Sequence, residues 1–114
     1  MIDLIVNMTA HPEKRRELLQ TLHELTRAMR QEHGFIDAQI GINAKDLNRI
    51  TFTEMWKTQE DMNVYMQESR YFPVLQGALK VLTASATIEL SDNAHQSTKE
   101  QRHTIFSYKH TRKR

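Results

Sequence analysis

The stretch from Thr53 to Leu82 constrains the fold more than any other part of the chain. It begins with the alternation of a strand and reaches Trp56, the only tryptophan. It then passes through a helix start and a Ser-Arg-Tyr-Phe-Pro sequence into a second apolar helix. Because proline is tolerated only in the first turn of a helix, Pro73 favours two helices over one long one. A tryptophan at a strand end, followed by aromatic residues on helices, predicts one wall of an aromatic-lined pocket.

The first of these two helices has a recognisable start signal. Thr58 stands three residues before Asp61, which resembles a capping box with Asp in place of the usual Glu. Apolar and aromatic residues follow at helical spacing: Met62, Tyr65 and Met66. The second helix carries its own apolar stripe, formed by Phe72, Leu75, Leu79 and Leu82.

The first third of the chain predicts a strand and a helix. Residues 1–10 alternate between an apolar face and a mixed face, which is typical of a strand. Pro12 then suits the first turn of a helix. The apolar stripe of that helix has spacings of four, three and four residues and consists of Leu18, Leu22, Leu25 and Met29. Gly34 stands where a left-handed residue would end the helix.

Three further strands complete the predicted order. Residues 35–43 and 49–56 alternate and are separated by turn-forming residues, which predicts a hairpin. Residues 85–90 are short and β-prone. The order β-α-β-β-α-α-β predicts an α+β, ferredoxin-like split β-α-β fold with an antiparallel four-stranded sheet over residues 1–90.

The C-terminal extension, residues 91–114, differs in charge from the rest of the chain. Residues 1–90 carry a net charge of −2, whereas the extension carries +4. Residues 91–99 are polar and are typical of a linker. Residues 104–108, Thr-Ile-Phe-Ser-Tyr, predict a strand that docks on a sheet edge of this chain or of a partner, although a frayed terminus stays an alternative. Without a basic face in residues 1–90, we expect no nucleic-acid partner.

Composition excludes several classes of function. The absence of cysteine rules out disulfides, thiolate metal sites and cysteine nucleophiles. The six histidines show no metal-binding spacing, and the three glycines form no phosphate-binding loop. The sequence lacks a membrane-length apolar run and a recognisable signal peptide, so we expect a cytoplasmic protein that does not bind membranes.

Polar residues near aromatic ones are the remaining candidates for chemistry. Asn7 interrupts an apolar strand, and its amide is expected either to be exposed or to point into a pocket where it holds a carbonyl or oxyanion. Trp56 and Tyr65 are each either core residues or pocket residues. Glu54 shares a strand face with Trp56, and a buried carboxylate there is expected to pair with a Lys or Arg rather than to act as a general base.

These residues also lie in motifs that resemble a known family. The motifs are Glu32 to Phe35 before the second strand, Glu54-Met55-Trp56-Lys57-Thr58, and Ser69-x-x-Phe72. In order and spacing, over residues 1–90, the chain resembles the antibiotic biosynthesis monooxygenase family of the dimeric α/β-barrel superfamily. The resemblance implies a homodimer in which two sheets pack face to face.

The resemblance also implies a reaction and a set of site residues. Some members oxidise small aromatic phenols or quinols with O2 and use neither metal nor flavin, so we expect a small aromatic ligand and no cofactor. By position, the catalytic candidates are Asn7, Trp56 and Tyr65. The expected substrate-lining residues are Phe35, Phe72 and Gln76.

Two departures from the family leave alternative functions open. Many members have His where this chain has Tyr65. Heme-degrading relatives have a His ligand at the position that aligns with Gln76, so heme binding is the least favoured function. The main alternative is a non-catalytic dimeric module that binds a small ligand or serves in regulation. The sequence does not decide between this module and an enzyme, and it does not name a substrate.

Overall fold

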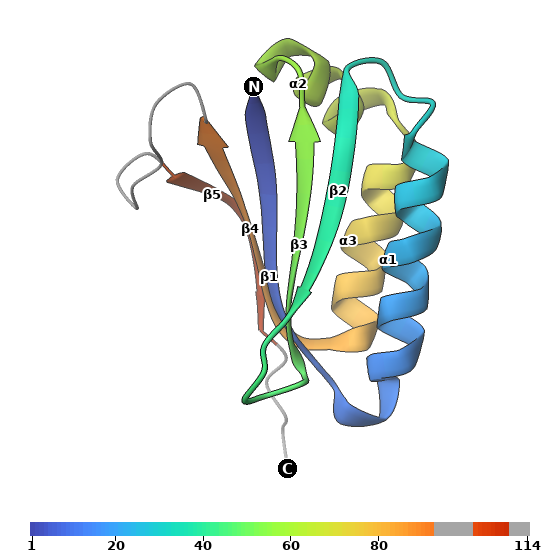
Figure 1. Cartoon of the computed structure of the whole chain (residues 1–114), viewed down its shortest axis with the longest axis vertical. Coiled ribbons are helices and arrows are strands. Elements are labelled where there is room, and N and C mark those ends of the chain that lie inside the picture. The colour runs from blue at the N-terminus through green and yellow to red at the C-terminus, as the bar shows by residue number, and fades with distance from the viewer. Residues whose placement is uncertain (93–101, 110–114) are drawn as a thin grey trace.

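The computed structural model describes residues 1–92 and 102–109. The elements lie in the order shown in Figure 1. They are β1 (Ile2–Ala10), the short 3-10 helix η1 (Pro12–Lys14), α1 (Arg15–Met29), β2 (Phe35–Ile42), β3 (Arg49–Trp56), α2 (Gln59–Glu68), α3 (Tyr71–Leu82), β4 (Thr83–Asp92) and β5 (Arg102–Lys109). No helix in this described part is long and apolar enough to cross a membrane.

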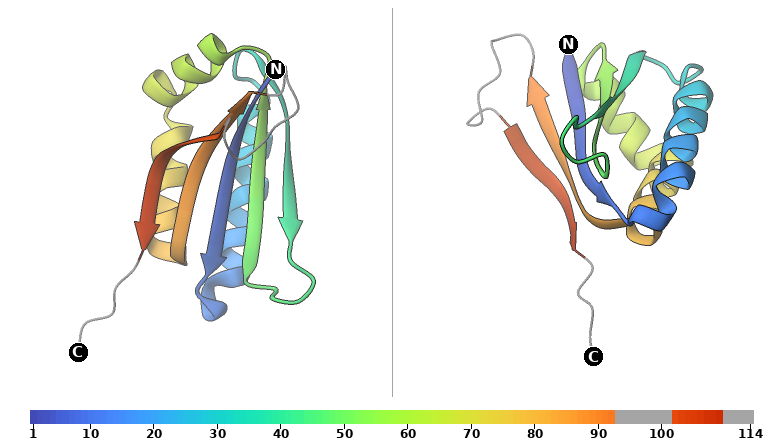
Figure 2. Two further views of the ribbon diagram at one scale, coloured as in Figure 1. Left: turned by 90° about the vertical axis from the view of Figure 1, so that its left-hand side faces the viewer. Right: turned by 60° about the horizontal axis from the view of Figure 1, so that its bottom comes forward.

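The strands form one antiparallel sheet in the order β2-β3-β1-β4-β5. Helices α1 and α3 lie side by side against one face of the sheet, and α2 lies near the end where β3 finishes (Figures 1 and 2). No helix formed by residues 1–92 or 102–109 lies on the other face. This architecture confirms the predicted α+β ferredoxin-like fold, with its second helix divided in two and an extra C-terminal strand.

The hydrophobic core lies between the sheet and the helices. Alternate residues of β1 point into it, and Leu4 and Val6 are fully buried. The apolar stripe predicted for α1 is buried as expected, and α3 buries Phe72, Leu75, Leu79 and Leu82. In contrast, α2 buries only Met62 and Tyr65. The helix nearest the strand end that carries Trp56 is therefore the least anchored of the three.

The start of α2 follows its sequence signal. Thr58 is the N-cap, and its hydroxyl oxygen accepts a hydrogen bond from the backbone N–H of Asp61 at 3.0 Å. This bond satisfies one of the N–H groups that a helix leaves unpaired in its first turn. The Thr58 signal, with Asp61 in place of the usual Glu, therefore marks the start of α2 correctly.

The sequence predicted that Gly34 would cap the C-terminus of α1, and this prediction was wrong. The helix ends at Met29, and Gly34 lies in the loop before β2 with a φ of +81°. Its carbonyl accepts a hydrogen bond from the N–H of Lys57 at 2.8 Å. A Cβ atom at this position would lie 2.3 Å from Oδ2 of Asp61. Glycine is needed here because this loop lies directly against the start of α2.

The C-terminal strand pairs with the sheet of its own chain. β5 lies antiparallel to β4, with Phe106 opposite Ile88, and the half-buried Phe106 packs against the core. The strand is longer than the five residues predicted. Most of the predicted linker, residues 93–99, and the basic residues 112–114 lie outside the described residues.

The two glycines Gly34 and Gly77 allow a matched test of this packing. Gly34→Ala should lower the free energy of unfolding by about 1–3 kcal/mol, because alanine disfavours positive φ and would contact Asp61. Gly77→Ala should instead raise it by up to about 1 kcal/mol, because Gly77 is in α3 and has nothing within 4 Å of an added Cβ. Urea unfolding measures the free energy of unfolding of both variants. Equal changes in the two variants would contradict the conclusion that Gly34 is needed for its positive φ and its contact with Asp61.

Candidate functional site

A fully buried carboxylate, that of Glu54, lies at the centre of the candidate site. It projects from β3 toward the helices, on the same strand face as Trp56. The indole Nε1–H of Trp56 donates to Oε1 of Glu54 at 3.2 Å, and the hydroxyl of Tyr65 on α2 donates to Oε2 at 3.2 Å. Both carboxylate oxygens therefore have a neutral donor, and the site links the end of β3 to α2.

Burial controls the protonation of this group. Desolvation raises the pKa of Glu54 from 4.5 to about 7, and the hydrogen bonds from Trp56 and Tyr65 oppose this rise only in part. The pKa of Tyr65 is also raised, first by burial and then by the charge of the neighbouring Glu54. The tyrosine hydroxyl therefore remains a hydrogen-bond donor, while the carboxylate can take up or release a proton near neutral pH.

Four aromatic rings form a continuous cluster that includes both hydrogen-bond donors to the carboxylate. Trp56 stacks on Tyr65 with ring centroids 4.6 Å apart. Phe35 contacts Trp56 edge to face at 5.4 Å, and Phe72 contacts Tyr65 in the same way at 5.6 Å. Offset and edge-to-face contacts are the favourable arrangements for aromatic pairs. The structure thus brings together four of the six predicted site residues: Phe35, Trp56, Tyr65 and Phe72. Two of them, Trp56 and Tyr65, bind Glu54, which was not among the six.

The sequence-based expectation for Glu54 was wrong about its partner. A Lys or Arg was expected, whereas the partners are an indole and a phenol. A signal for this arrangement was present in the sequence. Glu54 and Trp56 lie two residues apart on one buried strand face, and each needs a hydrogen-bond partner there.

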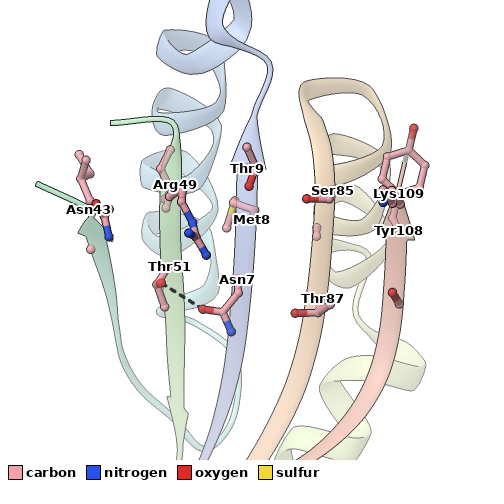
Figure 3. A pocket seen from close by; sticks show the side chains of 15 residues that line it. Asn7, Met8, Thr9, Asn43, Arg49, Thr51, Ser85, Thr87, Tyr108 and Lys109 are labelled. Atoms are coloured by element: carbon pink, nitrogen blue, oxygen red, sulfur yellow. Dashed lines mark hydrogen bonds between the residues drawn. The ribbon is translucent and has the colours of Figure 1, made fainter. Parts of the chain in front are cut away.

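Asn7 lies on the opposite face of the sheet. It pairs across the strands with Thr51 and Thr87, and its Oδ1 accepts a hydrogen bond from the Thr51 hydroxyl at 3.1 Å. It lines a cavity of about 700 Å³ on the face without helices, shown in Figure 3. Since the sheet separates the two faces, the structure does not bring Asn7 together with Trp56 and Tyr65, as the sequence had suggested.

The remaining predicted residue, Gln76, lies one turn after Phe72 on α3 and is half-buried. None of the hydrogen bonds or ring contacts that link the buried cluster involves its side chain. Its substrate-lining role stays a prediction.

The pH dependence of stability should report the burial of Glu54. Between about pH 4.5 and 7 the folded chain retains a proton that the unfolded chain releases, so stability falls as pH rises through this window. Relative to Glu54→Gln, the wild type should lose on the order of 3 kcal/mol across it and change little above pH 8. Urea unfolding from pH 4 to 8 measures this. Glu68→Gln, which changes an exposed carboxylate, is the control and should show the pH dependence of the wild type. If the free energy of unfolding of the wild type and of Glu54→Gln changed with pH in the same way, the raised pKa of Glu54 would be refuted.

Solved structures with this fold come from several bacteria. SnoaB, a cofactor-independent oxygenase from Streptomyces nogalater, superposes with a TM-score of 0.72 at 13% identity, covering 86% of this chain and 95% of SnoaB. A candidate antibiotic biosynthesis monooxygenase from Nitrosomonas europaea gives 0.72 at 17%, covering 83% and 100%. A further antibiotic biosynthesis monooxygenase gives 0.68 at 22%, covering 81% and 97%. At these identities the likeness shows the fold alone.

Sequence comparison supplies the family. A search of curated proteins gave no significant match. The profile of the family described as antibiotic biosynthesis monooxygenase matches residues 1–72, which include β1, the β2–β3 hairpin, α2 and the start of α3. The matched part also contains Glu54, Trp56 and Tyr65. The chain therefore belongs to the antibiotic biosynthesis monooxygenase family.

Proposed function

We propose that this protein is a cofactor-independent monooxygenase that oxidises a small aromatic phenol or quinol with O2. Family membership supports an oxygenase, and the likeness in fold to SnoaB is consistent with a reaction that uses no cofactor. The single observation that carries the proposal is the buried Glu54 carboxylate, whose pKa of about 7 suits a base that removes a phenolic proton near neutral pH.

Glu54 and three of the four aromatic residues have roles in this proposal. Glu54 takes the proton from the substrate hydroxyl. Trp56 and Phe72 supply aromatic surfaces that orient the ring. Tyr65 donates a hydrogen bond to the oxygen anion that forms, because its raised pKa keeps it protonated. Asn7 has no role in this reaction, since it lies across the sheet.

The proposed reaction balances without an added reductant. The phenolate gives one electron to O2, and the resulting radical and superoxide combine to form a C–O bond. A proton from Glu54 converts the peroxide to a hydroperoxide. Loss of the C–H proton and cleavage of the O–O bond then leave a carbonyl and water. The substrate supplies all four electrons that reduce O2, with one oxygen atom in the product and one in water.

Substrate entry requires the cluster to open. Trp56 is fully buried and Tyr65 is 2% exposed, so no ligand touches both rings in the described conformation. The element best suited to move is α2, which buries only two side chains and is joined to α3 by the short Ser69–Arg70 connection. Closure over a bound substrate would exclude water from the peroxide intermediate.

Oxygen uptake with anthrone or a simple quinol tests the proposal. The wild type should consume O2 above the buffer rate, and Glu54→Gln should lower kcat at least about 100-fold because the base is lost. Trp56→Phe should lower it less, since an aromatic surface remains. Activity of the wild type should rise as pH increases through about 7, where Glu54 becomes ionised.

Two controls make this result specific. Asn7→Ala should retain wild-type turnover, because Asn7 lies on the other sheet face. Glu68→Gln changes an exposed carboxylate on α2 and should also have no effect. Absence of uptake with every such substrate, together with saturable binding, would instead support the non-catalytic ligand-binding module.

We also propose that the protein works as a homodimer joined through the sheet face that carries no helix. Membership of the family supports this, because the resemblance to its members implies homodimers in which two sheets pack face to face. The helices of the described residues all lie on the other face, which leaves this face free to pack against a second copy. The cytoplasmic location expected from the sequence stays a prediction.

The mass in solution tests the dimer. Light scattering should give about twice the 13.4 kDa of one chain. Thr53→Arg places a charge in the middle of the helix-free face and should shift the mass toward the monomer. Val81→Arg alters an exposed residue of α3 and should not. A monomeric wild type would overturn this part of the proposal.

A further inference from the structure

We infer that the substrate first binds in a cavity between the C-terminal end of α1 and the α2–α3 connection, where Glu32 selects rings with a neutral hydroxyl group over anionic rings. The cavity has a volume of about 570 Å³, which is in the range of small-molecule sites. Its lining residues belong to the helices and the segments that adjoin them, so it lies away from the sheet face proposed for the dimer. The inference rests on the proposed function for its class of ligand, the phenols and quinols.

Two segments that are distant in the sequence form the walls of this cavity. The turn that follows α1 contributes Glu32, α2 contributes Val64 and Glu68, and α3 contributes its first residue, Tyr71. The C-terminal end of α1 and α2 lie at the same end of the molecule (Figure 1). The Ser69–Arg70 connection also lines the cavity, and it is the segment that bends if α2 moves. The cavity therefore borders the element that opens to admit a substrate.

The cavity also borders the buried aromatic cluster. Val64 lines the cavity, and the next residue, Tyr65, belongs to the cluster. In the same way, Tyr71 lines the cavity and the next residue, Phe72, contacts Tyr65 in the cluster. The cavity and the cluster therefore share α2 and the start of α3 as a common wall. A molecule held in the cavity reaches the cluster when α2 moves aside.

Backbone hydrogen bonds hold Glu32 in its position. Its N–H donates to the carbonyl of Met29 at 2.8 Å, and its carbonyl accepts from the N–H of Phe35 at 3.2 Å. Phe35 contacts Trp56 in the aromatic cluster. The short turn from Glu32 to Phe35 thus supplies one residue to the cavity and another to the cluster, which gives this sequence motif a function.

The side chain of Glu32 is available to a ligand. It is half-buried and forms no ion pair or hydrogen bond with the residues that the structure describes. The pKa of Tyr65 is raised by burial, by Glu54 and, to a smaller extent, by the charge of Glu32, so Glu32 lies within electrostatic range of the cluster. An ionised carboxylate only accepts hydrogen bonds. It therefore favours a ligand with a hydroxyl donor and repels an anion.

The other charges at the cavity do not cancel this preference. The guanidinium of Arg70 lies over the ring of Tyr71, 5.5 Å from its centroid, and Arg70 is exposed. Glu68 is also exposed and has the same sign of charge as Glu32. Water and salt screen exposed charges more than buried ones. The half-buried Glu32 therefore has the largest effect on a bound molecule.

Calorimetric titration of the full-length protein under nitrogen tests the inference, because binding without O2 is measured apart from turnover. The three probes have rings of similar size: 2-naphthol, quinoline and 2-naphthoate. We expect 2-naphthol to bind at least about tenfold more tightly than the others, since it alone offers a hydroxyl donor. Glu32→Gln should reduce the preference over 2-naphthoate at least about fivefold, because a neutral amide does not repel a carboxylate.

Matched variants locate the effect. Glu68→Gln removes an equal charge from an exposed position at the same cavity and should keep the wild-type preference. Val64→Trp fills the cavity and should weaken the binding of 2-naphthol. Val74→Trp adds the same bulk to α3 outside the cavity and should not, although Val64 and Val74 are similarly exposed, at 47% and 49%.

Three results would overturn the inference: no binding of 2-naphthol, an equal loss of preference in Glu68→Gln and Glu32→Gln, or equal weakening by the two Trp variants. Oxygen uptake separates this inference from the proposed reaction. Binding with the expected preference, in a protein that consumes no O2, would support the inference and refute the monooxygenase. Oxygen uptake by a protein whose Glu32→Gln variant keeps the wild-type preference would do the reverse.

Discussion

The burial of one carboxylate, that of Glu54, is the constraint on which the rest of this structure depends. Removing a charged group from water is costly unless hydrogen bonds replace its hydration. Trp56 and Tyr65 supply those bonds from the same strand and from α2. The bond from Tyr65 also ties α2, which buries only two side chains, to the sheet. The Tyr65 bond thus helps to hold the least anchored helix in place, while burial raises the pKa of Glu54 to about 7.

The sheet divides the molecule into two chemically different halves. On its helix side, a fully buried carboxylate accepts hydrogen bonds from two members of a cluster of four aromatic rings. On its other side lie hydroxyl and amide side chains such as those of Asn7, Thr51 and Thr87. This division follows from the pleat of each strand, which sends neighbouring residues to opposite faces. Glu54 and Thr53 are adjacent in sequence and belong to different surfaces for this reason.

Much of the fold could be predicted because local signals and tertiary packing agree. The alternation in β1 and β3, the Thr58 cap of α2 and the break before Pro73 all appear where the sequence placed them. Gly34 shows the limit of such signals. Its need for positive φ was readable, but the sequence did not show that Asp61, 27 positions later, fills the space beside it.

The sequence by itself determined the order of the elements, the Glu-x-Trp motif and the membership of a family. Only the tertiary structure decided which site residues meet. The resemblance to the family grouped Asn7 with Trp56, yet strand register sends their side chains to opposite faces. Glu54 received neutral donors because the fold brought Tyr65, eleven residues away, over the end of β3. Local sequence specifies which groups are present, whereas their partners depend on packing between elements.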